Sequence, residues 1–174
     1  MKKKLIALTL AAVLAISMLG CGSKEAADNS SSTSAPQEEE QTSSLMDKDV
    51  YLAEVEGVNS AAEDFMNALM NAMKEGADMG VVVEEIRATK DAFIAFSEID
   101  NPPEGYEEAH SRLAESSGKF GDFIDRYADL LRDANDGTIT DTAEYDEKAD
   151  ALATEMEEIT TELGNAMGEV QAIQ

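Results

Sequence analysis

Apolar side chains recur every three or four residues over most of the chain that follows residue 46. This spacing is typical of amphipathic helices, because it places the apolar residues on one side of each helix. The pattern predicts four helices, at about residues 47–75, 79–98, 101–134 and 141–174. No segment shows the alternating run of β-branched residues that is typical of strands.

The residues expected to face inward form one stripe on each predicted helix. The stripes of the last two helices are unbroken, and their spacing of about 3.5 residues favours the packing found in coiled coils. Thr89 weakens the middle of the second stripe. In chain order the four stripes contain Val55, Val58, Ala62, Phe65, Leu69, Ala72; Val82, Ile86, Phe93, Phe96; Tyr106, His110, Leu113, Ser117, Phe120, Ile124, Tyr127, Leu131, Ala134; and Tyr145, Ala149, Leu152, Met156, Ile159, Leu163, Ala166, Val170, Ile173.

Residues that end or start helices separate these segments. Gly76 and the stretch Asn135-Asp136-Gly137 are predicted to end helices, since glycine adopts the left-handed conformation easily. Asn101 is expected to cap the third helix, with Pro102 at its first position and Glu104 completing a capping box. Asp141 or Thr142 is expected to start the fourth.

Short links between helices favour antiparallel neighbours. Residues 47–174 are therefore predicted to form one all-α domain, an antiparallel up-down-up-down four-helix bundle.

The first twenty residues have a different pattern. Three lysines, at positions 2–4, precede an apolar run from Leu5 to Leu19, and Gly20 follows. A basic start, a short apolar run and a small residue are typical of a secretory signal peptide. As a helix the run would be about 22 Å long, too short for the roughly 30 Å hydrocarbon core of a bilayer.

The residues Met18-Leu19-Gly20-Cys21 resemble the lipobox of bacterial lipoproteins. The resemblance implies that residues 1–20 are a lipoprotein signal peptide that is cut off before Cys21. It further implies that Cys21 carries diacylglycerol, that its amino group is acylated as with palmitate, and that the protein is anchored on the extracytoplasmic face of the cell membrane. The alternative is a secreted protein without lipid.

Residues 21–46 contain the candidate lipidated cysteine and a stretch rich in Ser, Thr and Glu. Almost none of these side chains gains by burial, so the entropy of ordering the segment is not offset. We expect a disordered tether between the anchor and the bundle.

The charge of the chain is strongly negative, at −24. Loss of residues 1–20 removes three lysines and no acid, which leaves 10 Lys and Arg against 37 Asp and Glu. Such a surface repels nucleic acid and favours a cationic peptide, a basic protein or loosely held divalent cations. The alternative is that the acidic surface only keeps an envelope protein soluble and binds no partner. Because Cys21 is the single cysteine, no disulfide can form within one chain.

Two groups of residues are candidate metal ligands. Glu107 and His110 have the Glu-x-x-His spacing of di-iron bundles, but a di-iron site needs a second such motif and the chain has one histidine. A zinc site on His110 with carboxylates stays open, beside a histidine bonded to a backbone carbonyl, to Tyr106 or to a buried carboxylate.

Met66, Met70 and Met73 share one face of the first predicted helix, where thioethers could bind Cu(I). We expect them instead to fill space in the core.

Two further features have simple structural interpretations. Residues 133–144 resemble a calcium loop in part, but neither alignment supplies its set of oxygen ligands, so a turn at Gly137 is expected. Gly164 and Gly168, four residues apart, are expected to allow a neighbouring helix to approach closely.

The stretch Ile99-x-x-Pro102-Pro103-x-x-Tyr106-x-x-x-His110-x-x-Leu113 is similar to a pattern in small helical lipoproteins of Gram-positive bacteria. No free cysteine, phosphate-binding loop or nucleophile near the histidine is visible, so we expect neither catalysis nor a cofactor. The sequence favours a membrane-anchored acidic bundle that binds or scaffolds a partner. A metal-handling envelope protein (Cu, Zn or Ca) is the alternative.

Overall fold

The computed structural model describes residues 45–173, and all regular structure among these residues is helical. The expected all-α class is confirmed. The helices are α1 (Lys48–Ala72), α2 (Met79–Ala88), α3 (Lys90–Ser97), α4 (Glu107–Asp136) and α5 (Thr142–Ala172). The predicted signal peptide, Cys21 and nearly all of the tether lie outside the described residues.

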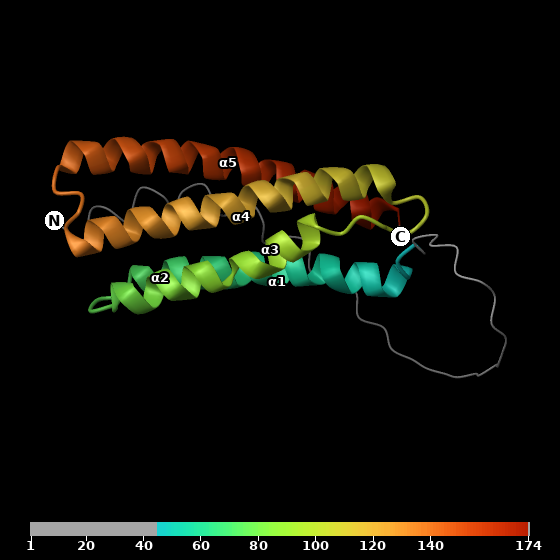
Figure 1. Ribbon diagram of the computed structural model, residues 1–174, viewed down its shortest axis with the longest axis horizontal. Helices are drawn as coiled ribbons and strands as arrows, with labels where there is room; N and C mark the ends of the chain where they lie inside the picture. Colours follow the sequence, from blue (N-terminus) through green and yellow to red (C-terminus); the bar gives the residue numbers. More distant parts are fainter. Residues whose placement is uncertain (1–44, 174) are drawn as a thin grey trace.

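Figure 1 shows the arrangement of the helices. α1 lies beside α2 and α3, α4 lies against α2 and α3, and α5 packs along α4. The links at 73–78 and 137–141 lie at one end of the molecule, and the α3–α4 loop and the end of α5 lie at the other. None of the helices in the described part is both long enough and apolar enough to cross a bilayer.

The predicted stripes form the core. Every predicted inward residue is buried except Ala134 and Leu152, which are half-buried, and Ile173, which is 41% exposed at the end of α5. Most of the core is one apolar cluster that draws side chains from all five helices. A second, small cluster of Leu130, Tyr145 and Ala149 joins α4 and α5 near their link.

The predicted helix at residues 79–98 is wrong as a single element, because it divides at Thr89 into α2 and α3. The Thr89 hydroxyl donates a hydrogen bond of 2.7 Å to the carbonyl oxygen of Ile86, three residues earlier. Its backbone N–H also bonds to Ile86 rather than to the residue four positions back. A threonine hydroxyl that binds a carbonyl of its own helix competes with the regular backbone bonding, and α2 ends next to this residue.

The predicted start of the third helix at Pro102, with Asn101 as its cap, is also wrong, because α4 begins at Glu107. Pro102 and Pro103 are buried in a loop, and Gly105 has a positive φ of 85°. The Tyr106 N–H donates to the Pro103 carbonyl at 3.1 Å, which closes a turn. The carbonyl of Asn101 accepts a hydrogen bond of 2.7 Å from the N–H of Met46, so the loop also holds the chain that enters α1.

The predicted end of the first helix at Gly76 is wrong, because α1 ends at Ala72 with Met73 as its C-cap, and Gly76 lies in the turn that follows. The remaining helix ends agree with the sequence. Asp47, Asp78 and Asp141 cap α1, α2 and α5 through side-chain bonds to backbone N–H groups. Gly137 ends α4 in the left-handed conformation, with φ of 76°.

The expected role of Gly164 and Gly168 is wrong. A Cβ atom added at either glycine would meet nothing within 4 Å. The close approach is instead at Gly121 of α4, where an added Cβ would lie 2.5 Å from Cδ1 of Ile94 in α3. α3 packs closely against α4 at Gly121, because this residue has no side chain.

Candidate functional site

Glu107 and His110 do not form a metal site together. His110 is buried, with 6% of its surface exposed, whereas Glu107 is exposed. The His110 Nε2 atom lies 2.8 Å from the carbonyl oxygen of Ile99, which is one of the expected partners. Among residues 45–173, no group of three or more His, Cys, Asp or Glu side chains is placed to hold a metal ion.

The three candidate methionines differ from one another. Met66 is half-buried and packs against the core, as expected. Met70 and Met73 are 46% and 40% exposed, so the expectation that all three fill the core is wrong. The cause is their position, since Met70 lies beside the core stripe of α1 and Met73 follows the last residue of that helix.

The segment 133–144 is a helix end followed by a helix cap. The N–H groups of Thr138 and Ile139 both donate to the carbonyl of Asp133, which ties off α4. The Asp133 carboxylate bonds to Arg132, and the Asp141 carboxylate accepts from the N–H of Ala143. Asp133 and Asp141 therefore each have a hydrogen-bond partner within the chain.

Cationic side chains in the described part mostly bind carboxylates of the same chain. Of the nine Lys and Arg at residues 45–173, at least seven form such ion pairs, and they are Arg87, Lys90, Arg112, Lys119, Arg126, Arg132 and Lys148. Residues 45–173 also contain 32 Asp and Glu, so most carboxylates are left without a cation. Such a surface is acidic over much of its area.

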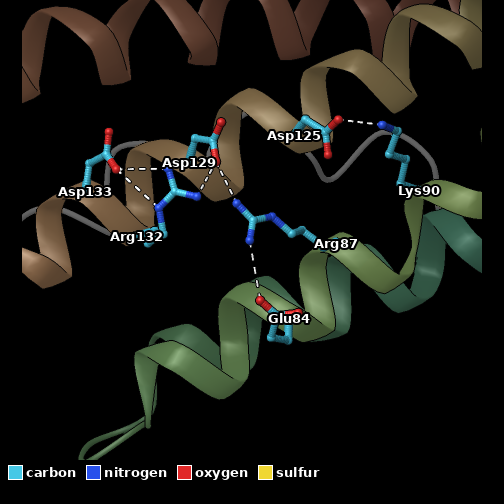
Figure 2. A network of polar contacts seen from close by, with 7 residues as sticks. All are labelled: Glu84, Arg87, Lys90, Asp125, Asp129, Arg132 and Asp133. Atoms are coloured by element: carbon cyan, nitrogen blue, oxygen red, sulfur yellow. Dashed lines mark hydrogen bonds and ion pairs between the residues drawn. The ribbon is translucent and has the colours of Figure 1, made fainter.

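Figure 2 shows how the ion pairs connect α2 and α3 with α4. Arg87 binds Asp129 of α4 at 2.6 Å and Glu84 of its own helix at 3.4 Å, while Arg132 also binds Asp129, at 3.0 Å. Lys90 of α3 binds Asp125. The hydrogen bond to Asp125 raises the pKa of the Lys90 ammonium, so this group stays charged.

The opposite side of α4 is paired with α5 in the same way. Arg112 and Lys119 bind Glu169 and Glu162 at 2.6 and 2.9 Å, and Arg126 binds Glu155. Six of the nine Lys and Arg at residues 45–173 are thus gathered around α4, between the two flanking layers of helices.

A groove runs between α1 and the α2–α3 pair. Small residues form much of its lining, and its acidic and amide side chains come from both walls. The complete lining is Gly57, Ser60, Ala61, Asp64, Asn67, Ala68, Asn71, Glu85, Ala88, Thr89 and Ala92. None of these is a Lys, an Arg or a His. The Asn71 amide donates to Glu85 at 3.1 Å across the groove and accepts from Lys74 at 2.6 Å.

A cluster of buried polar rings lies at the end of the bundle where α1 and α4 begin. The ring of Tyr51 stands edge-on to Tyr106 and His110, with centroids 5.3 and 5.6 Å apart. Phe96 of α3 closes the cluster, 5.4 Å from His110. Burial raises the pKa of Tyr51 to about 12, with a smaller contribution from Tyr106.

Sequence reasoning missed two of these features. Tyr51 could have been found, because it continues the α1 stripe four residues before Val55. The groove could not, since its walls come from helices whose relative rotation is set by packing across the whole core.

The fold and these features define an acidic all-helical bundle in which most of the cations of the described residues lie between helices. Comparison of the chain with protein-family models, with curated proteins and with solved structures finds no match.

Proposed function

We propose that the protein is a lipid-anchored, extracytoplasmic lipoprotein whose up-down-up-down bundle binds a cationic peptide or basic protein and catalyses no reaction. The anchor is the acylated Cys21, left after removal of residues 1–20, and the tether 21–46 separates it from the bundle. The lipobox-like residues 18–21 support the anchor. Buried acyl chains contribute about 0.8 kcal/mol per methylene, so two or three of them hold a small domain at a bilayer.

The observation that carries the binding function is the groove between α1 and α2–α3. Asp64 and Glu85 lie in this groove beside small residues, and its lining contains no Lys, Arg or His side chain. A Lys or Arg side chain of a partner would meet these carboxylates, while its aliphatic stem covers the alanines. Exposed ion pairs contribute less than about 1 kcal/mol each, so binding has to combine several of them with apolar contact.

The net charge strengthens the attraction at longer range. The field of a strongly acidic body raises the association rate of cationic partners, and this effect weakens once salt shortens the Debye length to about 8–10 Å. Affinity for a cationic peptide should therefore fall with ionic strength.

The test uses the mature chain from residue 21 with Cys21→Ser, titrated calorimetrically with a Lys-rich amphipathic peptide. The double variant D64N/E85Q should raise the dissociation constant about tenfold, which corresponds to about 1.4 kcal/mol. The control D150N/E157Q removes the same charge from exposed positions of α5. If both double variants weaken peptide binding equally, the attraction depends on net charge alone, and binding in the groove is refuted.

A second variant tests contact with the lining itself. Ser60 is exposed at the edge of the groove, so Ser60→Leu adds volume there without entering the core. Weaker binding with an unchanged melting temperature is expected. Unaltered binding would place the peptide elsewhere.

The anchor is tested separately by cell fractionation. Wild-type protein should sediment with membranes and the Cys21→Ser variant should not. Sedimentation of both with membranes would overturn lipidation at Cys21 and leave the groove experiment unaffected.

One observation favours a second candidate function, handling of Cu(I). Met70 and Met73 are exposed and share a helix face with Met66, so core packing does not account for all three thioethers. Melting scans with and without Cu(I), on wild type and on M70L/M73L, test this candidate. It fails if Cu(I) does not raise the melting temperature of the wild type.

A further inference from the structure

Three polar atoms inside the Tyr51–Tyr106–His110 cluster have no hydrogen-bond partner among the described residues. They are the hydroxyl oxygens of Tyr51 and Tyr106 and the Nδ1 atom of His110. The side chains are 0%, 3% and 6% exposed, so bulk water does not reach them. Buried polar groups in folded proteins almost always have a partner, either protein or ordered water.

The contacts of His110 determine what its free nitrogen can do. Nε2 lies 2.8 Å from the Ile99 carbonyl, and a carbonyl only accepts, so Nε2 carries the proton. In the neutral imidazole Nδ1 is then a bare acceptor. The two tyrosine hydroxyls can each donate and accept. The cluster therefore offers one acceptor and two groups that can donate or accept, contributed by α1, by the residue that precedes α4 and by the first turn of α4.

We propose that this cluster is an internal water site, in which ordered water donates to His110 Nδ1 and is bonded by the hydroxyls of Tyr51 and Tyr106. Water supplies two donors and two acceptors, and internal waters typically bind about three polar groups. A metal ion does not suit the site, because the cluster contains no carboxylate or thiolate and two of its three groups are neutral phenols. A cationic ligand would also lack a counter-charge there.

The position of the site gives it a structural role. The Ile99 carbonyl that binds His110 belongs to the loop whose Asn101 carbonyl binds Met46, at the entry to α1. Lys48, in the first turn of α1, lies 5.7 Å from the centre of the Tyr106 ring. Water at this site would connect α1 with the start of α4 beneath the loop that holds the incoming chain.

The direction of a stability change provides the first test. If the hydroxyls bind internal water, Tyr51→Phe and Tyr106→Phe in the mature Cys21→Ser chain each raise the unfolding equilibrium constant, by about 5- to 30-fold. The double variant then changes it less than the product of the single effects, because both groups bond to shared water. If the hydroxyls were unpaired, each substitution would stabilise the protein, and that result would overturn the proposal.

A second measurement detects the water directly. Magnetic relaxation dispersion of water nuclei reports internal water with long residence times, and its amplitude should be lower in Tyr51→Phe than in wild type. Tyr145→Phe is the control, since Tyr145 belongs to the small cluster at the other end of the bundle and should leave the amplitude unchanged. An equal amplitude in wild type and Tyr51→Phe would also overturn the proposal.

His110 supplies an independent signal, because it is the single histidine of the chain. The ¹⁵N shifts of its ring should show a protonated Nε2 and an Nδ1 that accepts a hydrogen bond. Tyr51→Phe should move the Nδ1 shift toward that of an unbonded acceptor. An Nδ1 shift typical of an unbonded acceptor already in the wild type would contradict water at this site.

Discussion

Three of the four glycines within α4 and α5, at positions 121, 164 and 168, should respond to alanine in opposite directions. Glycine within a helix is less favourable than alanine by about 0.5–1 kcal/mol, because more backbone entropy is lost on folding. At Gly164 and Gly168 a Cβ atom meets nothing within 4 Å, so the full gain should be realised. We expect G164A/G168A to increase the free energy of unfolding by about 1–2 kcal/mol.

Gly121→Ala should have the opposite effect. Its Cβ would lie 2.5 Å from Cδ1 and 3.1 Å from Cγ1 of Ile94, so Ile94 has to change rotamer or α3 has to shift. Overpacking of this kind costs about 1–3 kcal/mol, which exceeds the gain in helix propensity. The expected net loss is about 0.5–2 kcal/mol.

Urea and thermal denaturation followed by circular dichroism measure both effects. For a domain of this size 1 kcal/mol corresponds to about 3–5 °C in melting temperature. Ile94→Ala removes the two clashing atoms, so the double variant I94A/G121A should be more stable than the sum of the single effects predicts. If Gly121→Ala stabilises the protein as much as G164A/G168A does per site, the close packing of α3 on α4 is refuted.

Two further predictions concern pH and helix capping. Burial raises the pKa of Tyr51 and of Tyr145 from 10.0 to about 12, so the unfolded chain loses these protons first as pH rises. The stability that both groups contribute is complete below pH 10 and is lost as pH rises from 10 towards 12. In melting scans across this range, the melting temperature should therefore fall more steeply with pH for the wild type than for Y51F/Y145F. Equal slopes would contradict the burial of these hydroxyls. Asp141→Ala removes the side-chain bond to the N–H of Ala143 and should lower the free energy of unfolding, measured by urea denaturation, by about 0.5–2 kcal/mol. Asp141→Asn keeps the acceptor oxygen and should change this free energy little. A similar loss in both variants would mean that the charge of Asp141, rather than its hydrogen bond, stabilises the helix.

The candidate sites were predictable to different degrees. Burial of His110 follows from its place on the apolar stripe of α4, whereas its bond to a backbone carbonyl was one of three partners that the sequence left open. Burial of Tyr51 could have been predicted by extending the apolar stripe of α1 four residues back from Val55. Exposure of Met70 and Met73 was not predictable, because methionine is common both in cores and on surfaces. The groove beside Asp64 and Glu85 depends on how α1 and α2–α3 approach each other, and neither helix encodes that alone.

The errors in the predicted helices have local causes that act only in the folded chain. Asn101 and Pro102 are a standard start for a helix, yet the loop in which they lie is held by Met46 and by His110, and this places the first turn of α4 at Glu107. At Thr89 the hydroxyl binds Ile86 and the helix breaks, although the apolar spacing continues through it.

Periodic apolar residues, together with Asp47, Asp141 and Gly137 at helix ends, were enough to predict from the sequence that residues 47–173 form an all-α domain and which side of each helix is buried. These signals are local, because a helix buries whichever face is apolar and ends where a cap satisfies its backbone. Tertiary structure decided which glycine is in close contact, which cations join α4 to its neighbours and which polar rings meet inside the core. Such features depend on the rotation and offset of one helix against another, and these follow from the packing of all the buried side chains together.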